Sequence, residues 1–215
     1  MYYTAPRIFD GNSWRSGTIG TEGGRVKAIA ADAPEDNPDV RIYTDACIVP
    51  AFVDAQVYGA GGRLFSAYPD TTSLRILAEA AWQGGAALCQ PTVATNTLEV
   101  VHACIDAVRA YWKEGGEGIG GLHLEGPWIS PQRKGAHVEG CIHPPTVAEV
   151  QALLEYGRGV IQTITLAPEV CSVEILDLLL QSGIKLSAGH SNATLEEALA
   201  AFDRGIPAVT HLYNA

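Results

Sequence analysis

The chain has 215 residues, with 14 Lys and Arg against 24 Asp and Glu, and a formal net charge of −10. This acidic balance argues against binding to nucleic acid or to an anionic membrane surface, because both require clustered basic side chains. A small anionic substrate remains compatible with it, since backbone N–H groups, a metal or a single cation can hold an anion locally. With 47% hydrophobic residues, the chain suits one large domain, or one domain and part of another.

The cysteines and the N-terminus indicate where the protein resides. Five cysteines are scattered along the chain without a C-x-x-C motif, which favours reduced thiols in the cytosol. The first residues, MYYTAPRIFDGNSW, lack a basic segment followed by an apolar stretch, so no signal peptide is predicted. No window approaches the roughly 20 apolar residues of a membrane span. We therefore expect a cytoplasmic protein without membrane contact.

Residues 1–47 contain short strand-like segments separated by turn signals such as Asp10-Gly11 and the polar stretch DAPEDNPD. This spacing predicts a small β layer, part of a β-sandwich domain. From residue 48 onward, apolar segments alternate with helical ones, which is typical of a parallel β/α series. We therefore expect a domain boundary between residues 47 and 48, with the β/α domain over 48–215.

The β/α series contains six predicted units. The strands are predicted over 48–57, 86–95, 118–126, 160–169, 184–192 and 207–215, and the helices near 72–83, 97–113, 146–156, 172–182 and 194–204. Two helices begin with a capping-box pattern, Thr146 with Glu149 and Thr194 with Glu197. Glycines follow several helices where a left-handed cap is expected, as at Gly183 and Gly205.

Polar residues fall mostly at the carboxyl ends of these strands, at Gln56, Gln90, Glu125, Glu169, His190 and His211. In a parallel β/α sheet, active sites are built at that edge. Glu125 ends an apolar strand within GLHLEGPWIS and is followed at once by Gly126-Pro127. A buried carboxylate needs a strong partner, because an unpaired buried charge costs several kcal/mol. Together with His190 and His211, it would form a three-ligand metal site with room for water.

Each of these residues also has a structural interpretation. A single histidine at a strand end is often only a hydrogen-bonded structural residue, and His123, deeper in the same strand as Glu125, is the clearest such case. Glu169 has three interpretations: a substrate contact, an additional carboxylate near the site, or a neighbour of a helix N-cap. Two histidines and a carboxylate also make the facial triad of non-haem iron oxygenases, although ligands on three strand ends of a β/α series disfavour that reading.

Several motifs together resemble one known family. GLHLEGPWISPQRKGAH, LSAGHSNATLEEA and THLYNA are similar to motifs of the N-acetylglucosamine-6-phosphate deacetylases of the amidohydrolase superfamily, as are VPAFVDAQVYGAGG and TLAPE. The motifs occur in the family's order along essentially the whole chain. The resemblance implies a (β/α)8 TIM-type barrel with a small β-sandwich layer, of which this chain holds about six β/α units. It also implies a homodimer at full length.

The resemblance assigns roles to individual residues. Its metal ligands fall on Glu125, His190 and His211. Its substrate contacts fall on Ala136 and His137, and on Asn214 and Ala215, which would hold the sugar phosphate.

The first barrel strand departs from the pattern of many amidohydrolases. Those proteins carry H-x-H there for a second metal, whereas this chain has Gln56-Val57-Tyr58. Gln is a weak neutral ligand and Tyr is a poor one at neutral pH. One divalent ion is therefore expected, with zinc as the first choice and iron or another divalent ion as alternatives. The single-metal members usually have Asn at the second position, so the resemblance assigns no role to Tyr58.

The implied reaction is hydrolysis of the acetamide of N-acetylglucosamine 6-phosphate by a metal-activated water, giving glucosamine 6-phosphate and acetate. The family's proton-shuttling Asp would lie beyond residue 215, and neither Asp54 nor Glu169 is a good substitute. We therefore expect an N-terminal portion that contains no catalytic residue and does not turn over by itself. The alternatives are an inactive module that binds metal or sugar phosphate, and an amidohydrolase for another N-acetylated amino sugar or an acyl amino acid.

Overall fold

The structure, a computed structural model, describes residues 1–34 and 37–213. The chain forms two compact units, Met1–Phe52 and Val53–Ala215. None of the helices in the described part of the chain combines the length and the apolar character that crossing a bilayer requires.

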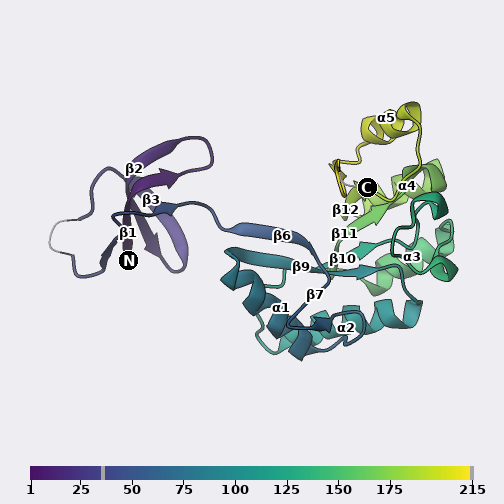
Figure 1. Ribbon diagram of the computed structural model, residues 1–215, viewed down its shortest axis with the longest axis horizontal. Coiled ribbons are helices and arrows are strands. Elements are labelled where there is room, and N and C mark those ends of the chain that lie inside the picture. The colour runs from purple at the N-terminus through teal and green to yellow at the C-terminus, as the bar shows by residue number, and fades with distance from the viewer. Residues whose placement is uncertain (35–36, 214–215) are drawn as a thin grey trace. The chain divides into compact units, whose positions relative to one another are not determined.

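The first unit is a five-stranded mixed sheet (Figure 1). Its strands are β1 (Tyr2–Phe9), β2 (Trp14–Glu22), β3 (Arg25–Ala30), β4 (Val40–Ile42) and β5 (Cys47–Ile48). The sheet has the order β3-β2-β1-β4, and β5 also pairs with β1. β2 is antiparallel to both β1 and β3, whereas β4 and β5 run parallel to β1. The β layer expected near the N-terminus is therefore confirmed.

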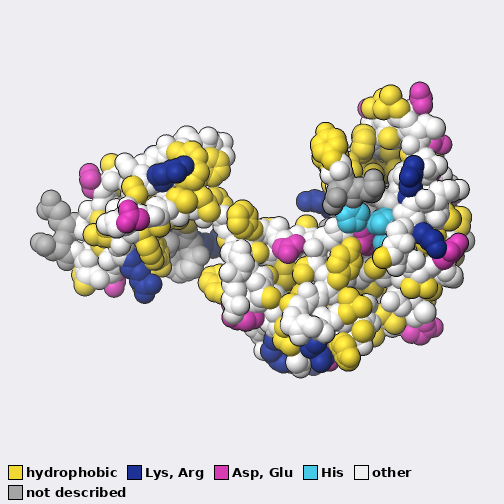
Figure 2. All heavy atoms as spheres, in the orientation of Figure 1, with side chains coloured by type: hydrophobic (Ala, Val, Ile, Leu, Met, Phe, Trp, Pro, Cys, Tyr) yellow, Lys and Arg dark blue, Asp and Glu magenta, His cyan; other side chains and the backbone are white. Residues whose placement is uncertain are grey.

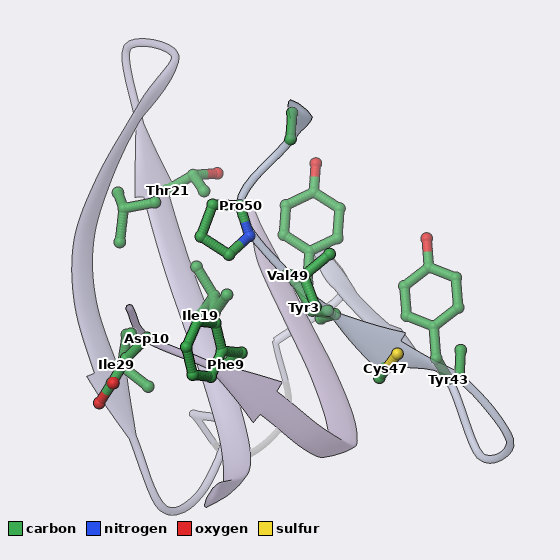
Figure 3. A pocket seen from close by; sticks show the side chains of 14 residues that line it. Tyr3, Phe9, Asp10, Ile19, Thr21, Ile29, Tyr43, Cys47, Val49 and Pro50 are labelled. Carbon is green, nitrogen blue, oxygen red and sulfur yellow. The ribbon is translucent and has the colours of Figure 1, made fainter. Parts of the chain in front are cut away.

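One face of this first sheet carries an apolar pocket (Figure 3). Phe9, Ile19 and Ile29 line it from the strands, and Val49 and Pro50 line it from the segment that follows β5. Asp10 also lies at this pocket, and its carboxylate accepts hydrogen bonds from the backbone N–H groups of the turn between β1 and β2. This turn was predicted from the Asp-Gly pair that it contains.

The second unit is built on a six-stranded sheet with the order β13-β12-β11-β10-β9-β6. Its strands are β6 (Phe52–Val57), β9 (Ala86–Ala94), β10 (Leu122–Glu125), β11 (Ile161–Leu166), β12 (Lys185–Ala188) and β13 (Ala208–Val209). From β9 to β13 each neighbouring pair is parallel. Sequential order and parallel pairing confirm the partial β/α barrel. A small hairpin, β7 (Gly59–Ala60) with β8 (Arg63–Leu64), follows β6.

Five α-helices connect these strands and cover one side of the curved sheet (Figure 1). They are α1 (Thr71–Gln83), α2 (Leu98–Lys113), α3 (Val147–Tyr156), α4 (Val173–Gln181) and α5 (Leu195–Arg204). Short 3-10 turns lie at η1 (Pro131–Arg133), η2 (Glu139–Cys141) and η3 (Pro168–Val170). Both predicted capping boxes are present, at the starts of α3 and α5. Gly205 ends α5 in the left-handed conformation, with φ of 117°.

The core of the second unit is apolar and continuous from strands to helices. Leu122 and Leu124 of β10, Ile164 of β11 and Leu186 of β12 are all buried, and Ile105 of α2 packs in the same cluster. Parallel strands buried on both faces explain why these segments are nearly continuous apolar runs in the sequence. The last residues of such strands are thereby held rigidly at one edge, where the polar side chains lie.

Two sequence-based expectations need correction. The predicted strand over 48–57 is divided, because Cys47–Ile48 pairs with β1 in the first sheet and the barrel strand begins only at Phe52. Pro50, which has no backbone N–H to donate, lies between the two segments. Gln90 is not at a strand end but within β9, which continues to Ala94, and its side-chain oxygen accepts from Thr163.

The cysteines give a direct test of this fold. Burial raises the pKa of the Cys104 thiol to about 12 and that of Cys89 to about 11, whereas Cys47 is exposed. Because the thiolate is the reactive form, we expect iodoacetamide at pH 8 to label Cys47 rapidly and to spare Cys89 and Cys104 in the native chain. Peptide mass spectrometry before and after addition of denaturant measures this, and rapid native labelling of Cys104 would contradict the described core.

Candidate metal centre

Glu125 is the central residue of the candidate site. It is the last residue of β10, it is 0% exposed, and its strand pairs with β9 and β11 on either side. The next residue, Gly126, has φ of 83°, and a Cβ there would lie 2.1 Å from Oγ1 of Thr95. Glycine is therefore required where the chain turns away directly after the carboxylate.

Two histidines from neighbouring strand ends meet one oxygen of this carboxylate. Nε2 of His190 lies 3.0 Å from Oε1 of Glu125, and Nε2 of His211 lies 2.9 Å from the same oxygen. The histidines follow β12 and β13, and both have left-handed backbones, with φ of 48° and 59°. Such conformations are uncommon for residues other than glycine and concentrate at functional sites. Figure 2 shows histidine side chains gathered at one place on the second unit.

The hydrogen bonds of His190 determine which of its nitrogens is available. Nδ1 lies 2.8 Å from the carbonyl oxygen of Arg133, which can only accept, so Nδ1 carries the proton. In the neutral ring, Nε2 then presents a lone pair to Oε1 of Glu125. Two acceptors at this distance repel each other unless a proton or a metal cation lies between them. The hydrogen bond to Glu125 accordingly raises the pKa of His190.

The ionisation of Glu125 is equally constrained. Burial alone would raise its pKa, but hydrogen bonds from His190 and Tyr58 outweigh burial and lower it to about 2. The carboxylate is therefore charged at ordinary pH. A negative charge at this buried point favours a cation beside it, either the proton on Nε2 of His190 or a metal ion in its place.

His137 is also close, but its orientation differs. Glu125, His137 and His190 bring possible ligand atoms within 4.8 Å of one another. However, the backbone N–H of Thr95 donates to Nδ1 of His137, so the proton of the neutral ring is on Nε2, 3.7 Å from Oε2 of Glu125. Nε2–H is a donor and not a lone pair. His137 therefore suits hydrogen bonding to a bound molecule better than it suits metal ligation, although it satisfies the distance.

Gln56 and Tyr58 complete the surroundings of Glu125. Nε2 of Gln56 donates to Oε1 of Glu125 and to the phenol oxygen of Tyr58, and each donor–acceptor distance is 2.9 Å. The phenol in turn donates to Oε2 of Glu125. Burial first, and then this hydrogen bond, raise the pKa of Tyr58, so the phenol stays protonated. Both residues contact the carboxylate, which the sequence alone did not indicate.

His123 is the structural residue that the sequence suggested. Its Nδ1 donates to the carbonyl oxygen of Ala55, 2.9 Å away, so Nε2 must accept from the hydroxyl of Thr165 at 2.7 Å. Burial lowers the pKa of His123 and keeps the ring neutral. The hydroxyl of Thr165 then accepts from Thr210, which accepts from Ser187. This series, the hydroxyl chain, connects the strands beneath Glu125.

Glu169 has a structural task at the rim. Its carboxylate accepts from the hydroxyl of Ser191 at 2.7 Å and from the backbone N–H of Asn192 at 2.5 Å. The side chain of Asn192 accepts from Nε of Arg133, whose carbonyl oxygen holds His190. Glu169 thus anchors the loop that carries His190.

Of the other predicted site residues, only some lie in the described part of the chain. Ala136 is exposed in the loop beside His137, and Asn214 and Ala215 lie outside the described residues. Thr95, which fixes the ring of His137, was not predicted, although its position at the end of the second predicted strand was an available signal. The carbonyl of Arg133 had no such signal, because any residue provides a backbone oxygen.

A parallel β/α sheet with a carboxylate and histidines at the carboxyl ends of its strands has the arrangement of a partial barrel whose site lies at that edge. Comparison with known proteins narrows this class. No family model matches the chain. A Shewanella (strain ANA-3) N-acetylgalactosamine-6-phosphate deacetylase is 38% identical over 191 residues, which are 89% of this chain and 48% of that protein. Human N-acetylglucosamine-6-phosphate deacetylase is 37% identical over 226 residues, covering 100% of this chain and 55% of the relative.

Solved structures agree with these relatives. The N-acetyl-D-glucosamine-6-phosphate deacetylase of Mycobacterium smegmatis, in complex with N-acetyl-D-glucosamine-6-phosphate, superposes with a TM-score of 0.88 at 30% identity. The alignment covers 100% of this chain and 56% of that one. The chain is thus a member of the N-acetylglucosamine-6-phosphate deacetylase family, and it spans about half the length of the curated relatives it matches.

Close packing behind His190 generates one prediction. A Cβ at Gly189 would lie 2.7 Å from Cγ2 of Thr165 and 2.9 Å from Cβ of Thr210. We expect Gly189→Ala to lower the free energy of unfolding by about 1–3 kcal/mol through overpacking, as measured by urea denaturation. Gly140→Ala is the matched control, because a Cβ there meets nothing within 4 Å. Equal stability of the two variants would contradict the described packing.

The anchoring role of Glu169 generates another. Glu169→Gln keeps the shape but leaves one acceptor oxygen for two donors, so we expect faster amide hydrogen exchange at Asn192 and a loss of about 1–3 kcal/mol in stability. Glu79→Gln, at an exposed position on α1, is the control. Unchanged exchange at Asn192 would show that the loop does not depend on this carboxylate.

Proposed function

We propose that this chain belongs to an enzyme that hydrolyses the acetamide of N-acetylglucosamine 6-phosphate, giving glucosamine 6-phosphate and acetate. The observation that carries the proposal is the convergence of His190 and His211 on one oxygen of the buried Glu125, within 3.0 Å. The family relationship supports the reaction class and the substrate class. Because the chain spans about half of its relatives, the activity is proposed for the whole protein.

Glu125, His190 and His211 are the proposed ligands of one divalent metal ion. Ligand atoms bound at about 2.0–2.1 Å in a tetrahedron lie roughly 3.3 Å apart. The separations of Oε1 of Glu125 from Nε2 of His190 and from Nε2 of His211, 3.0 and 2.9 Å, are close to this value. Two imidazole nitrogens and one carboxylate oxygen suit zinc, our first choice, and also iron and other divalent ions. Such an ion, when bound, lowers the pKa of a water ligand and polarises a carbonyl group.

The surrounding side chains have proposed tasks in the reaction. His137 presents Nε2–H beside the metal position, where it can donate to the acetamide or to another substrate oxygen. Ala136, and Asn214 and Ala215 outside the described residues, are the other proposed substrate contacts. Within the described residues, neither Asp54, whose carboxylate accepts from the backbone N–H of Gln56, nor Glu169, which holds a loop, hydrogen-bonds to Glu125. We therefore assign no proton-shuttling carboxylate to this chain.

One specific observation favours a second sugar. The Shewanella relative, at 38% identity, is named for the galactosamine epimer. N-acetylgalactosamine 6-phosphate is accordingly the second candidate substrate. A cytoplasmic location and a homodimer at full length remain predictions from the sequence and from the family resemblance.

The proposal is tested by metal content and acetate release. We expect the chain to bind one divalent ion, and Glu125→Gln and His190→Asn to weaken that binding by more than about 100-fold. Equilibrium dialysis with metal analysis measures this, and His102→Asn, which stacks on Tyr156 away from the site, is the control.

Acetate release by the whole protein, with each epimer of the 6-phosphate, tests the reaction itself. Release from either sugar phosphate that is lost in Glu125→Gln supports a deacetylase. Metal and sugar-phosphate binding without acetate release would instead support a binding module.

A further inference from the structure

Tyr58 is the residue near Glu125 to which neither the metal site nor the reaction assigns a role. It follows β6, two residues after Gln56, so both side chains leave the backbone on the same side. Its own carbonyl oxygen accepts from the N–H of Phe65, 2.8 Å away, which fixes the backbone at this point. Phe65 is fully buried. The phenol is thus held on a rigid support directly beside the carboxylate.

The direction of each hydrogen bond here can be deduced. Gln56 has two N–H hydrogens on Nε2; one faces Oε1 of Glu125 and the other faces the oxygen of Tyr58. The opposite orientation of the amide would place its oxygen against a carboxylate oxygen, so this one is required. The phenol oxygen therefore accepts from Gln56 and donates its only hydrogen to Oε2 of Glu125.

The two oxygens of Glu125 consequently have different surroundings. Oε1 accepts from Gln56 and also faces the Nε2 atoms of His190 and His211, which lie on the side of the proposed ion. Oε2 is within direct hydrogen-bonding contact of the phenol, so no cation fits between these two groups. A carboxylate that is held in this way binds a metal through one oxygen only.

We propose that Tyr58 is a positioning residue that holds Oε2 of Glu125, so that the carboxylate offers Oε1 alone to the metal ion. The inference rests on the proposed metal site and adds the reason for its coordination mode.

The experiment loads the protein with Co²⁺ and compares it with Tyr58→Phe, which removes only the hydroxyl. We expect Tyr58→Phe to bind Co²⁺ about 10–100-fold more weakly. We also expect a weaker visible absorption per ion, because Oε2 is then free to add to the coordination and tetrahedral Co²⁺ absorbs most strongly. Tyr68→Phe, at an exposed position in the same unit, is the matched control. Circular dichroism verifies that each variant is folded.

Unchanged affinity and spectrum in Tyr58→Phe would overturn the role of Tyr58 and leave the proposed metal site intact. If the unsubstituted protein binds no ion, the proposed metal site fails and this inference fails with it.

Discussion

The structure of the second unit depends on keeping one negative charge at the end of a buried strand. Removing a carboxylate from water without partners costs several kcal/mol, and Glu125 is fully buried. The fold meets this cost with donors from β6 and the residue after it, at one edge of the sheet, and with histidines that follow β12 and β13, at the other edge. The sheet must therefore curve enough for these edges to approach one carboxylate. The curvature of the sheet and the geometry of the site therefore depend on each other.

Much of this arrangement could be predicted from the sequence, for identifiable physical reasons. Capping boxes such as Thr194 with Glu197 define helix starts through local hydrogen bonds, which need no tertiary information. Buried parallel strands are visible as continuous apolar runs, and their order follows from the β/α alternation. Once the order is known, Glu125, His190 and His211 must share an edge. The division of the strand predicted over 48–57 was not visible, because apolar residues continue through Pro50 from one sheet to the other.

The finer features of the site were not predictable, because they depend on hydrogen-bond direction. His137 and His190 are both histidines close to Glu125, yet Thr95 and the carbonyl of Arg133 give them opposite protonation patterns. No residue pattern encodes that difference, since one partner is a backbone N–H and the other is a backbone oxygen. Tyr58 is similar: its residue type suggested a poor ligand, whereas its geometry makes it a donor to the ligand.

The hydroxyl chain below Glu125 has a consequence for the neighbouring strands. The carbonyl of Ala55 can only accept, so Nδ1 of His123 must donate to it. The hydroxyls of Thr165, Thr210 and Ser187 must then each donate to the preceding member of the chain. Because the links belong to different strands, sliding one strand by a single residue would replace a hydroxyl with a side chain that faces the other side. The hydroxyl chain below Glu125 therefore fixes the register of these strands. Apolar side chains of similar size in its place would tolerate a slip.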